Sequence, residues 1–249
     1  DSKIKLSYIS GLRSVILDEL KRSNFETLDE DDDSVFVRFS ESNIQGVKKL
    51  RSVARAYLVL QSGIYHPTYI SNHKSILGNL IDIVVKYDNF KSFKISCAGS
   101  DSLEVRSIAK YVQETYRVDE SDEADLKIHI IKPENIWEIG IQITPRPLSV
   151  RDYKVINVSG AMDPTIAYAV NSFCNLDSAR SYLNVFSGSA TLLIEAGQRY
   201  PNLDKLLGFD NNKKHLSLSI HNIKKAGLIK KVQIKEIDIF DKPDFGTFD

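Results

Sequence analysis

A turn of small residues followed by two carboxylates is the part of this chain whose residue types and spacing could support chemistry. An apolar segment, Leu183–Phe186, leads into Gly188, and a second apolar segment ends at Asp210. The separation of about 20 residues is the one found between a ligand-binding turn and the acid that takes a ribose hydroxyl. The spacing therefore predicts a nucleoside-containing ligand across the carboxyl ends of two neighbouring parallel strands.

The composition of the turn indicates which nucleoside ligand it suits. A dinucleotide site uses Gly-x-Gly-x-x-Gly, so that backbone amides can close on a pyrophosphate at a helix N-terminus. Here the second and third of these positions hold Ala190 and Leu193, so a pyrophosphate is poorly provided for. A cofactor without phosphates, such as S-adenosyl-L-methionine, needs close backbone approach at one point and a carboxylate for its ribose. The turn favours that cofactor, although an ordinary strand–turn–helix fits the same residues.

The residues after Asp210 predict two further elements of a parallel sheet. His215–Ala226 has helical periodicity, and Gly227 stands where a C-terminal cap is expected. Residues 232–237 then form a third apolar strand, which ends at Asp238. Alternating strands and helices build a parallel sheet, so the glycine turn and the two acids should share one rim. An acid at the end of the third strand could accept a hydrogen bond from an adenine amino group.

Several segments resemble one family of RNA methyltransferases. Asn184 precedes Gly188 by four residues, which resembles the first motif of class I methyltransferases, although Ala190 replaces its second glycine. Five segments resemble motifs of RNA methyltransferases that carry a THUMP domain: Phe186–Glu195, Gly208–Asn211, Asn222–Leu228, Arg146–Lys154 and Asp163–Val170. The resemblance extends over most of the chain.

This resemblance implies a fold, an activity and a set of ligand contacts. Relatives bind S-adenosyl-L-methionine and methylate the exocyclic N2 of guanine in tRNA or rRNA, with the THUMP module gripping the RNA. The implied fold is α/β with an α+β N-terminal part. It comprises a ferredoxin-like module (1–60), a THUMP module (61–155) and a partial Rossmann-like class I methyltransferase domain (156–249). The residues expected at the cofactor are Pro164, Thr165, Asn184, Ser187, Gly188, Ser189, Thr191, Asp210, Asn211, Asp238 and Ile239.

The catalytic motif of the family is expected outside this sequence. In relatives an Asp/Asn-Pro-Pro-Phe/Tyr or Asp-Leu-Pro-Phe-Gly motif lies at the end of the fourth strand, whereas this chain ends at Asp249, where that strand should begin. Catalytic residues are therefore expected beyond Asp249. The 249-residue chain is expected to bind cofactor weakly and not to turn over.

The charge of the chain provides no general attraction for RNA. Lysine and arginine together number 33, as do aspartate and glutamate, so any RNA site must be a local patch. One candidate is the group of six lysines between Asn211 and Lys235, and another is the linker that follows Pro145. The predicted RNA contacts are Arg146, Arg151, Lys154, Lys213 and Lys214.

Composition limits the remaining classes of protein. An apolar content of 42% over 249 residues supports packed cores in two or three domains. No uncharged apolar run approaches the roughly 18 residues of a membrane span. Cys97 and Cys174 are too few for a disulfide framework or a zinc knuckle, and the five histidines lack metal-ligand spacing. We therefore expect a cytoplasmic protein without a metal, whose oligomeric state the sequence leaves open.

Periodicity predicts the elements around these motifs. The apolar positions of Ile44–Tyr57 indicate an amphipathic helix, and segments 126–130 and 137–143 indicate an antiparallel hairpin. Asp163 and Pro164 suit the N-cap and the first position of another helix. The inward-facing residues of that helix are predicted to be Ile166, Ala169, Val170 and Phe173.

Two other functions fit the sequence. A non-catalytic RNA-binding protein could use the N-terminal modules beside a vestigial methyltransferase half. A nicotinamide-dependent enzyme with an unusual turn is the third reading, and the missing glycine-rich cradle argues against it.

Overall fold

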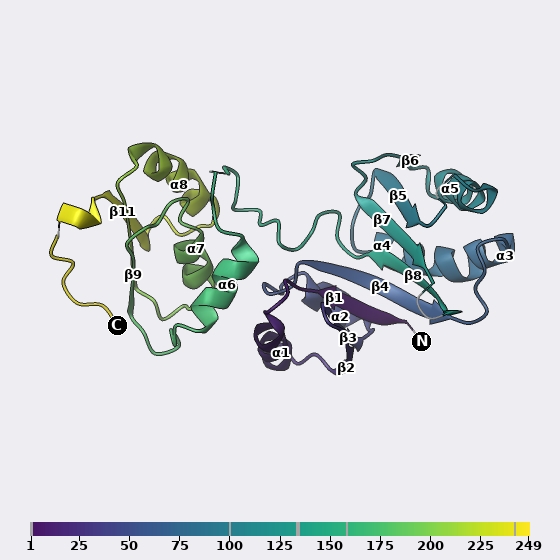
Figure 1. The fold of residues 1–249 in the computed structure, drawn as a ribbon, viewed down its shortest axis with the longest axis horizontal. Helices are drawn as coiled ribbons and strands as arrows, with labels where there is room; N and C mark the ends of the chain where they lie inside the picture. The colour runs from purple at the N-terminus through teal and green to yellow at the C-terminus, as the bar shows by residue number, and fades with distance from the viewer. Residues whose placement is uncertain (1, 100, 133–134, 158, 242) are drawn as a thin grey trace. The chain divides into compact units, whose positions relative to one another are not determined.

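The structure is a computed structural model that describes residues 2–99, 101–132, 135–157, 159–241 and 243–249 (Figure 1). The chain forms two compact units, Asp1–Leu148 and Ser149–Asp249. Each unit has a hydrophobic core of its own. The two are therefore described separately, as an N-terminal and a C-terminal unit.

The N-terminal unit is built on one mixed sheet of eight strands, in the order β2-β3-β1-β4-β8-β7-β5-β6. Neighbouring strands run antiparallel except β5, which is parallel to both β7 and β6. The strands are β1 (Lys3–Ser7), β2 (Thr27–Glu30), β3 (Ser34–Arg38), β4 (Arg55–Ser62), β5 (Ser92–Cys97), β6 (Asp119–Glu120), β7 (Leu126–Ile131) and β8 (Trp137–Gln142).

The helices of this unit pack on one face of the sheet. Alternate strand residues such as Ile4, Leu58 and Ile139 are fully buried and share a core cluster with helix residues such as Ile16 and Ile81. In Figure 1, α2 and α4 lie behind the strands. The helices are α1 (Arg13–Arg22), α2 (Glu41–Val47), α3 (Ile70–Asn72), a π-helical turn (His73–Gly78), α4 (Asn79–Val85) and α5 (Leu103–Tyr116).

The structure corrects one predicted element of this unit and confirms another. The helix predicted over Ile44–Tyr57 ends at Val47, and Arg55–Ser62 form β4 instead. Pairing explains the change, because β4 hydrogen-bonds to β1 on one side and to β8 on the other. The predicted hairpin is confirmed by the antiparallel pairing of β7 with β8. The proposed boundary between residues 60 and 61 falls inside β4, and the division into separate modules stays a prediction.

The C-terminal unit alternates helices with a parallel sheet, as predicted. Its three strands lie in the order β11-β10-β9, and both pairings are parallel. The elements are α6 (Pro164–Ser172), β9 (Ser181–Asn184), α7 (Thr191–Arg199), β10 (Lys205–Asp210), α8 (Lys213–Lys225), β11 (Val232–Glu236) and a 3-10 turn (Ile239–Asp241). Because all three strands run in one direction, the segments that follow them emerge at the same rim.

The inward face predicted for α6 is wrong. Of the four residues predicted to face inward, only Ala169 is buried, whereas Ile166 and Val170 are both 38% exposed and Phe173 is 70% exposed. The buried face carries the small and polar residues Ala167, Tyr168 and Asn171. The Asn171 side chain donates to the carbonyl of Leu192 at 2.9 Å, so a hydrogen bond to α7 fixes which face turns inward.

Candidate functional site

The turn between β9 and α7 is held against the neighbouring strand by backbone hydrogen bonds. The Ser187 N–H donates to the Phe209 carbonyl at 2.7 Å, and the Ala190 N–H donates to the Ser187 carbonyl at 2.7 Å. Gly188 and Ala190 both have left-handed backbones, with φ of 49° and 63°. Such a backbone costs an L residue about 1–2 kcal/mol. Ala190 therefore carries backbone strain in this turn. The resembled family has glycine at this position.

Two glycines at the turn have opposite surroundings, one open and one tightly packed. A Cβ on Gly188 would meet no atom within 4 Å, so the backbone there faces open space. A Cβ on Gly208 of β10 would lie 2.7 Å from Leu193 Cδ1 and 2.8 Å from Ser187 Cβ. The turn thus packs directly on Gly208 and presents an open backbone at Gly188.

Asp210 connects the turn with the end of β10. Its Oδ2 accepts a hydrogen bond from the Gly188 N–H at 2.9 Å, and its Oδ1 accepts from the Asn212 N–H at 2.9 Å. Its carbonyl accepts from the Ile237 N–H at 3.1 Å, which ties β11 to the same place. His215 Nδ1 also lies 4.0 Å from Oδ1. A carboxylate offers about four acceptor positions, and the two hydrogen bonds to the side chain use two of them.

Asp238 lies at the same rim, two residues after β11 ends. Its Oδ1 accepts from the Phe240 N–H at 2.9 Å, and its Oδ2 accepts from the Asn211 side chain at 3.4 Å. Asn211 and Asp238 are thereby brought together, with Ile239 next in the chain. The structure therefore places the turn, Asp210 and Asp238 on one rim; that they hold a cofactor stays a prediction.

The hydroxyl groups expected at the cofactor fall into two sets. Ser189 and Thr191 hydrogen-bond to each other at 2.9 Å. The hydroxyls of Ser187 and Thr165 are buried and have no hydrogen-bond partner among the described residues. A buried hydroxyl without a partner costs free energy, so each of these two oxygens is suited to a bound polar group. The Asn184 side chain accepts from the Phe186 N–H at 3.1 Å and so shapes the turn.

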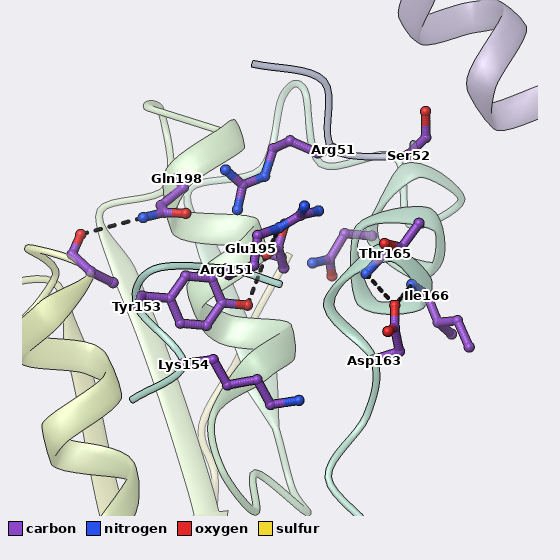
Figure 2. Close-up of polar contacts among 12 residues, drawn as sticks. Arg51, Ser52, Arg151, Tyr153, Lys154, Asp163, Thr165, Ile166, Glu195 and Gln198 are labelled. Carbon is purple, nitrogen blue, oxygen red and sulfur yellow. Dashed lines mark hydrogen bonds and ion pairs between the residues drawn. The ribbon is translucent and has the colours of Figure 1, made fainter. Parts of the chain in front are cut away.

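Helix α6 begins at the predicted cap. Asp163 Oδ1 accepts from the Thr165 N–H at 2.7 Å and from the Ile166 N–H at 3.4 Å (Figure 2). Pro164 occupies the first turn, where its missing N–H costs nothing. Pro164 and Thr165 are both buried.

A buried ion pair beside the site was missed by the sequence analysis. Glu195 of α7 is fully buried, and its Oε1 accepts from Arg151 Nε at 3.2 Å and from the Tyr153 hydroxyl at 2.8 Å (Figure 2). The contact joins the linker to α7, 44 residues away in sequence. A carboxylate among the apolar residues of α7 was the available signal, because buried charges require partners.

The residues predicted to contact RNA are placed in several environments. Arg151 is engaged with Glu195, and its side chain is only 8% exposed. Lys154 donates to the Met162 carbonyl at 2.9 Å, and burial lowers the pKa of its ammonium group against the opposing effect of Asp163 and Glu195. Arg146 is exposed. Lys213 and Lys214 are exposed in the first turn of α8, which the Asn212 side chain caps.

Two classes of feature are absent from the described residues. They contain no cluster of three or more potential metal ligands. They also contain no helix that is long and apolar enough to cross a membrane.

Comparison with known proteins relates the C-terminal unit to a methyltransferase family. Residues 151–249 match the family described as RMKL-like, methyltransferase domain. The chain is 29% identical over 105 residues to the U6 snRNA (guanine-N(2))-methyltransferase THUMPD2 of Bos taurus and, equally, of Mus musculus. The aligned part is 42% of this chain and 20% or 19% of those relatives, so the chain spans about a fifth of their length.

Solved structures share the fold of the whole chain. The predicted N6-adenine-specific DNA methylase of Listeria monocytogenes has a TM-score of 0.69 at 16% identity, covering 99% of this chain and 77% of its own. TrmN from Thermus thermophilus has a TM-score of 0.69 at 17% identity, covering 96% of this chain and 74% of its own. The predicted fold class, α/β with an α+β N-terminal part and a class I methyltransferase domain, is thereby confirmed, while the ferredoxin-like and THUMP assignments stay predictions.

Proposed function

We propose that this chain is part of an S-adenosyl-L-methionine-dependent methyltransferase that acts on the exocyclic N2 of guanine in RNA. The observation that carries the proposal is the bond from the Gly188 N–H to Asp210, which fixes an open turn and a carboxylate at one rim. The family match of residues 151–249 supports methyl transfer. The relatives named as guanine-N2 methyltransferases of U6 snRNA support the base and the class of nucleic acid.

The residues present at the rim fit this cofactor. Asp210 would accept from the ribose hydroxyls with its two remaining acceptor positions, and Asp238 would accept from the adenine amino group. The open backbone at Gly188 would admit the methionine portion, because nothing lies within 4 Å of its Cβ position. Thr165 and Ser187 would give their unpartnered buried hydroxyls to the ligand. A related fold has been solved with S-adenosylhomocysteine bound.

Methyl transfer requires the protein mainly to position the cofactor and the guanine. The cofactor, when bound, supplies a methyl group on a positively charged sulfur. The backbone of the turn and the two acids would fix the nucleoside end, so that the methyl group stands at a constant place. Holding two reactants in line contributes much of the rate in reactions of this kind. A guanine within a duplex would have to leave the base stack to reach the site.

The remaining assignments extend the same proposal. The N-terminal residues would grip the RNA, with residues 1–60 as a ferredoxin-like module, 61–155 as a THUMP module and 156–249 as the methyltransferase part. The RNA would be tRNA or rRNA, in the cytoplasm. Lys213, Lys214 and Arg146 are the exposed members of the predicted RNA contacts.

Calorimetry with S-adenosylhomocysteine tests the cofactor site. Asp210→Ala should weaken binding by about tenfold or more, because hydrogen bonds to a charged group contribute about 1.5–3 kcal/mol each. Asp204→Ala is the matched control, since Asp204 is a 70% exposed acid just before the start of β10, at the opposite rim. Absence of binding to the unaltered chain, or equal affinity in the Asp210 variant, would contradict the proposed site.

A further inference from the structure

His215 lies beside the carboxylate to which the proposed function assigns the ribose. Its Nδ1 is 4.0 Å from Asp210 Oδ1. This separation is longer than a hydrogen bond, and a small side-chain rotation would shorten it to the roughly 2.7–2.9 Å of a charge-assisted one. The two side chains can therefore meet without a change in the backbone.

The start of α8 fixes this arrangement. The Asn212 side chain accepts from the His215 N–H at 3.2 Å, and the Asn212 backbone N–H donates to Asp210 Oδ1 at 2.9 Å. Asn212 thereby connects the backbone of His215 to the carboxylate itself. His215 stays beside Asp210 as long as the helix cap is formed.

The two side chains differ in their access to water. The His215 side chain is 34% exposed, so water can solvate an imidazolium there, whereas the Asp210 side chain is 13% exposed. Water and salt screen a partly enclosed pair of charges less than a fully exposed pair. A positive charge on His215 is therefore attracted to Asp210.

The acceptor positions of Asp210 are few enough for one added donor to matter. Each carboxylate oxygen offers about two positions. On Oδ1 one is used by the Asn212 N–H, and on Oδ2 one is used by the Gly188 N–H. A ribose presents two neighbouring hydroxyl donors, so it needs both of the positions that are left. An imidazolium bonded to Oδ1 would leave the ribose only one.

Histidine is the kind of charged group at this rim that responds to pH near neutrality. The other charged groups on the elements around the pair, in α8 and from the end of β11 onward, are Lys213, Lys214, Lys235, Glu236, Asp238 and Asp241. Glu236 is in register with Asp210. The turn and the start of α7, residues 186–194, carry no charged side chain. Carboxylates and lysines ordinarily keep their charge between about pH 5 and 8, whereas histidine ordinarily changes its charge near 6.5.

We propose that His215 makes cofactor binding depend on pH through Asp210. As an imidazolium it bonds to Asp210 Oδ1 and takes the place of one ribose hydroxyl. As a neutral imidazole it leaves that position to the cofactor. The proton comes from solvent and returns to solvent when the ribose binds. This inference rests on the proposed function, which assigns Asp210 to the ribose, and it adds a residue that regulates the same site.

Calorimetry with S-adenosylhomocysteine at about pH 7.5 and about pH 5.5 tests the inference on the full chain. The unaltered chain should bind about tenfold more weakly at the lower pH, which is the effect of losing one hydrogen bond to a charged group. His215→Leu should bind equally at both pH values, with the affinity of the unaltered chain at the higher one. His215→Lys, which keeps a positive charge, should bind about tenfold more weakly at both.

Proton release gives a second readout, which a merely structural role of His215 would not change. At about pH 6.5, titrations in buffers of different ionisation enthalpy should show that the unaltered chain releases protons on binding and that His215→Leu does not. A variant that only loosened α8 would bind more weakly and still release them. His221→Leu is the matched control, because His221 is the other histidine of the C-terminal unit and is exposed on the same helix. It should keep both the pH dependence and the proton release.

The outcomes separate this inference from the proposed function. If S-adenosylhomocysteine binds and His215→Leu keeps the pH dependence, the inference fails and the proposed function stands. Binding by the unaltered chain that is independent of pH, or equal effects of the His215 and His221 variants, would have the same meaning. Absence of binding at both pH values would overturn the proposed function and the inference with it. Circular dichroism checks that each variant is folded.

Discussion

The two units expose their polar residues in different places, at a rim in one and on a face in the other. In the C-terminal unit all three strands are parallel, so the turn after β9, Asp210 and Asp238 converge where the strands end. In the N-terminal unit neighbouring strands mostly run in opposite directions, and polar side chains gather on the uncovered side instead. Parallel sheets concentrate backbone amides and helix starts at one edge, whereas a mixed sheet with helices on one side leaves a whole surface free. Strand direction therefore decides whether the polar residues of a unit collect at a rim or on a face.

Both units bury carboxylates, and the surroundings of Glu195 differ from those of Glu138. Glu195 has no exposed surface and meets Arg151, which is itself only 8% exposed. Glu138 is 2% exposed, but its partners Lys5 and His129 are 23% and 19% exposed. Water can therefore solvate the partners of Glu138 better than it can solvate the Arg151 guanidinium group.

The largest effect is expected from Glu195→Ala. Removing one member of a buried ion pair costs about 3–5 kcal/mol, since the other charge stays in a medium of low polarity. Urea denaturation followed by hydrogen exchange should show this loss in the C-terminal unit, with the protection of the N-terminal sheet unchanged. Asp204→Ala, which removes the exposed partner of Arg180, should cost less than about 1 kcal/mol. An equal cost in the two variants would mean that Glu195 is not isolated from water as the structure has it.

Glu138→Gln should have a smaller effect that depends on pH. The folded pKa of Glu138 is lowered, so its charge stabilises the fold above the unfolded pKa of about 4.3 and ceases to do so as pH falls through the folded value. At pH 7 the variant should lose about 1.5–3 kcal/mol, the contribution of hydrogen bonds to a charged group. Below the folded pKa the two proteins should converge. Denaturation series at several pH values measure the difference, and a difference that grows with acid would contradict the sign.

Gly208→Ala tests how tightly the rim is packed. The new methyl group would stand 2.8 Å from Ser187 Cβ, which is fixed to the turn, so the turn itself has to move. Overpacking of this kind costs about 1–3 kcal/mol, and S-adenosylhomocysteine should bind more weakly as well. Gly197→Ala is the control in the same unit, because its Cβ would approach most closely the flexible end of Leu228, at 3.0 Å, and next the end of Leu206, at 3.5 Å. Normal ligand affinity in the Gly208 variant would show that the turn adjusts freely.

The parts of the structure that depend on residues near one another in sequence could be predicted, whereas β4, which depends on pairing with distant strands, could not. The cap at Asp163, the α/β alternation and the position of Asp210 follow from local pattern, and the structure has them. The helix predicted across Ile44–Tyr57 failed because β4 is defined by its partners β1 and β8, both distant in sequence. Hydrophobic spacing alone did not contain that information.

The partners of polar side chains were the second feature that the sequence did not predict. The inward face of α6 is chosen by Asn171 bonding to Leu192 of α7, so larger apolar residues such as Phe173 are left outside. Arg151 reads as a surface cation in sequence, yet Glu195 draws it into the interior. Polar side chains with distant partners thus overrode both the apolar pattern and the charge pattern.

The smallest effect is expected from removing a helix cap, and here the two units should differ only in ligand binding. The Asn212 side chain accepts from Lys214 N–H at 3.0 Å and from His215 N–H at 3.2 Å, and the Ser102 hydroxyl accepts from Val105 N–H at 3.3 Å in the N-terminal unit. Asn212→Ala and Ser102→Ala should each cost about 1 kcal/mol, because the cap satisfies similar backbone donors in both. Only Asn212 also donates its backbone N–H to Asp210, so loosening this cap should weaken S-adenosylhomocysteine binding several-fold, while Ser102→Ala leaves it unchanged. Asn212→Ser should restore both stability and affinity, since serine caps about as well as asparagine. If calorimetry found equal ligand affinity in the two alanine variants, the rim would not depend on the helix that follows it, and this contrast between the two units would lose its physical basis.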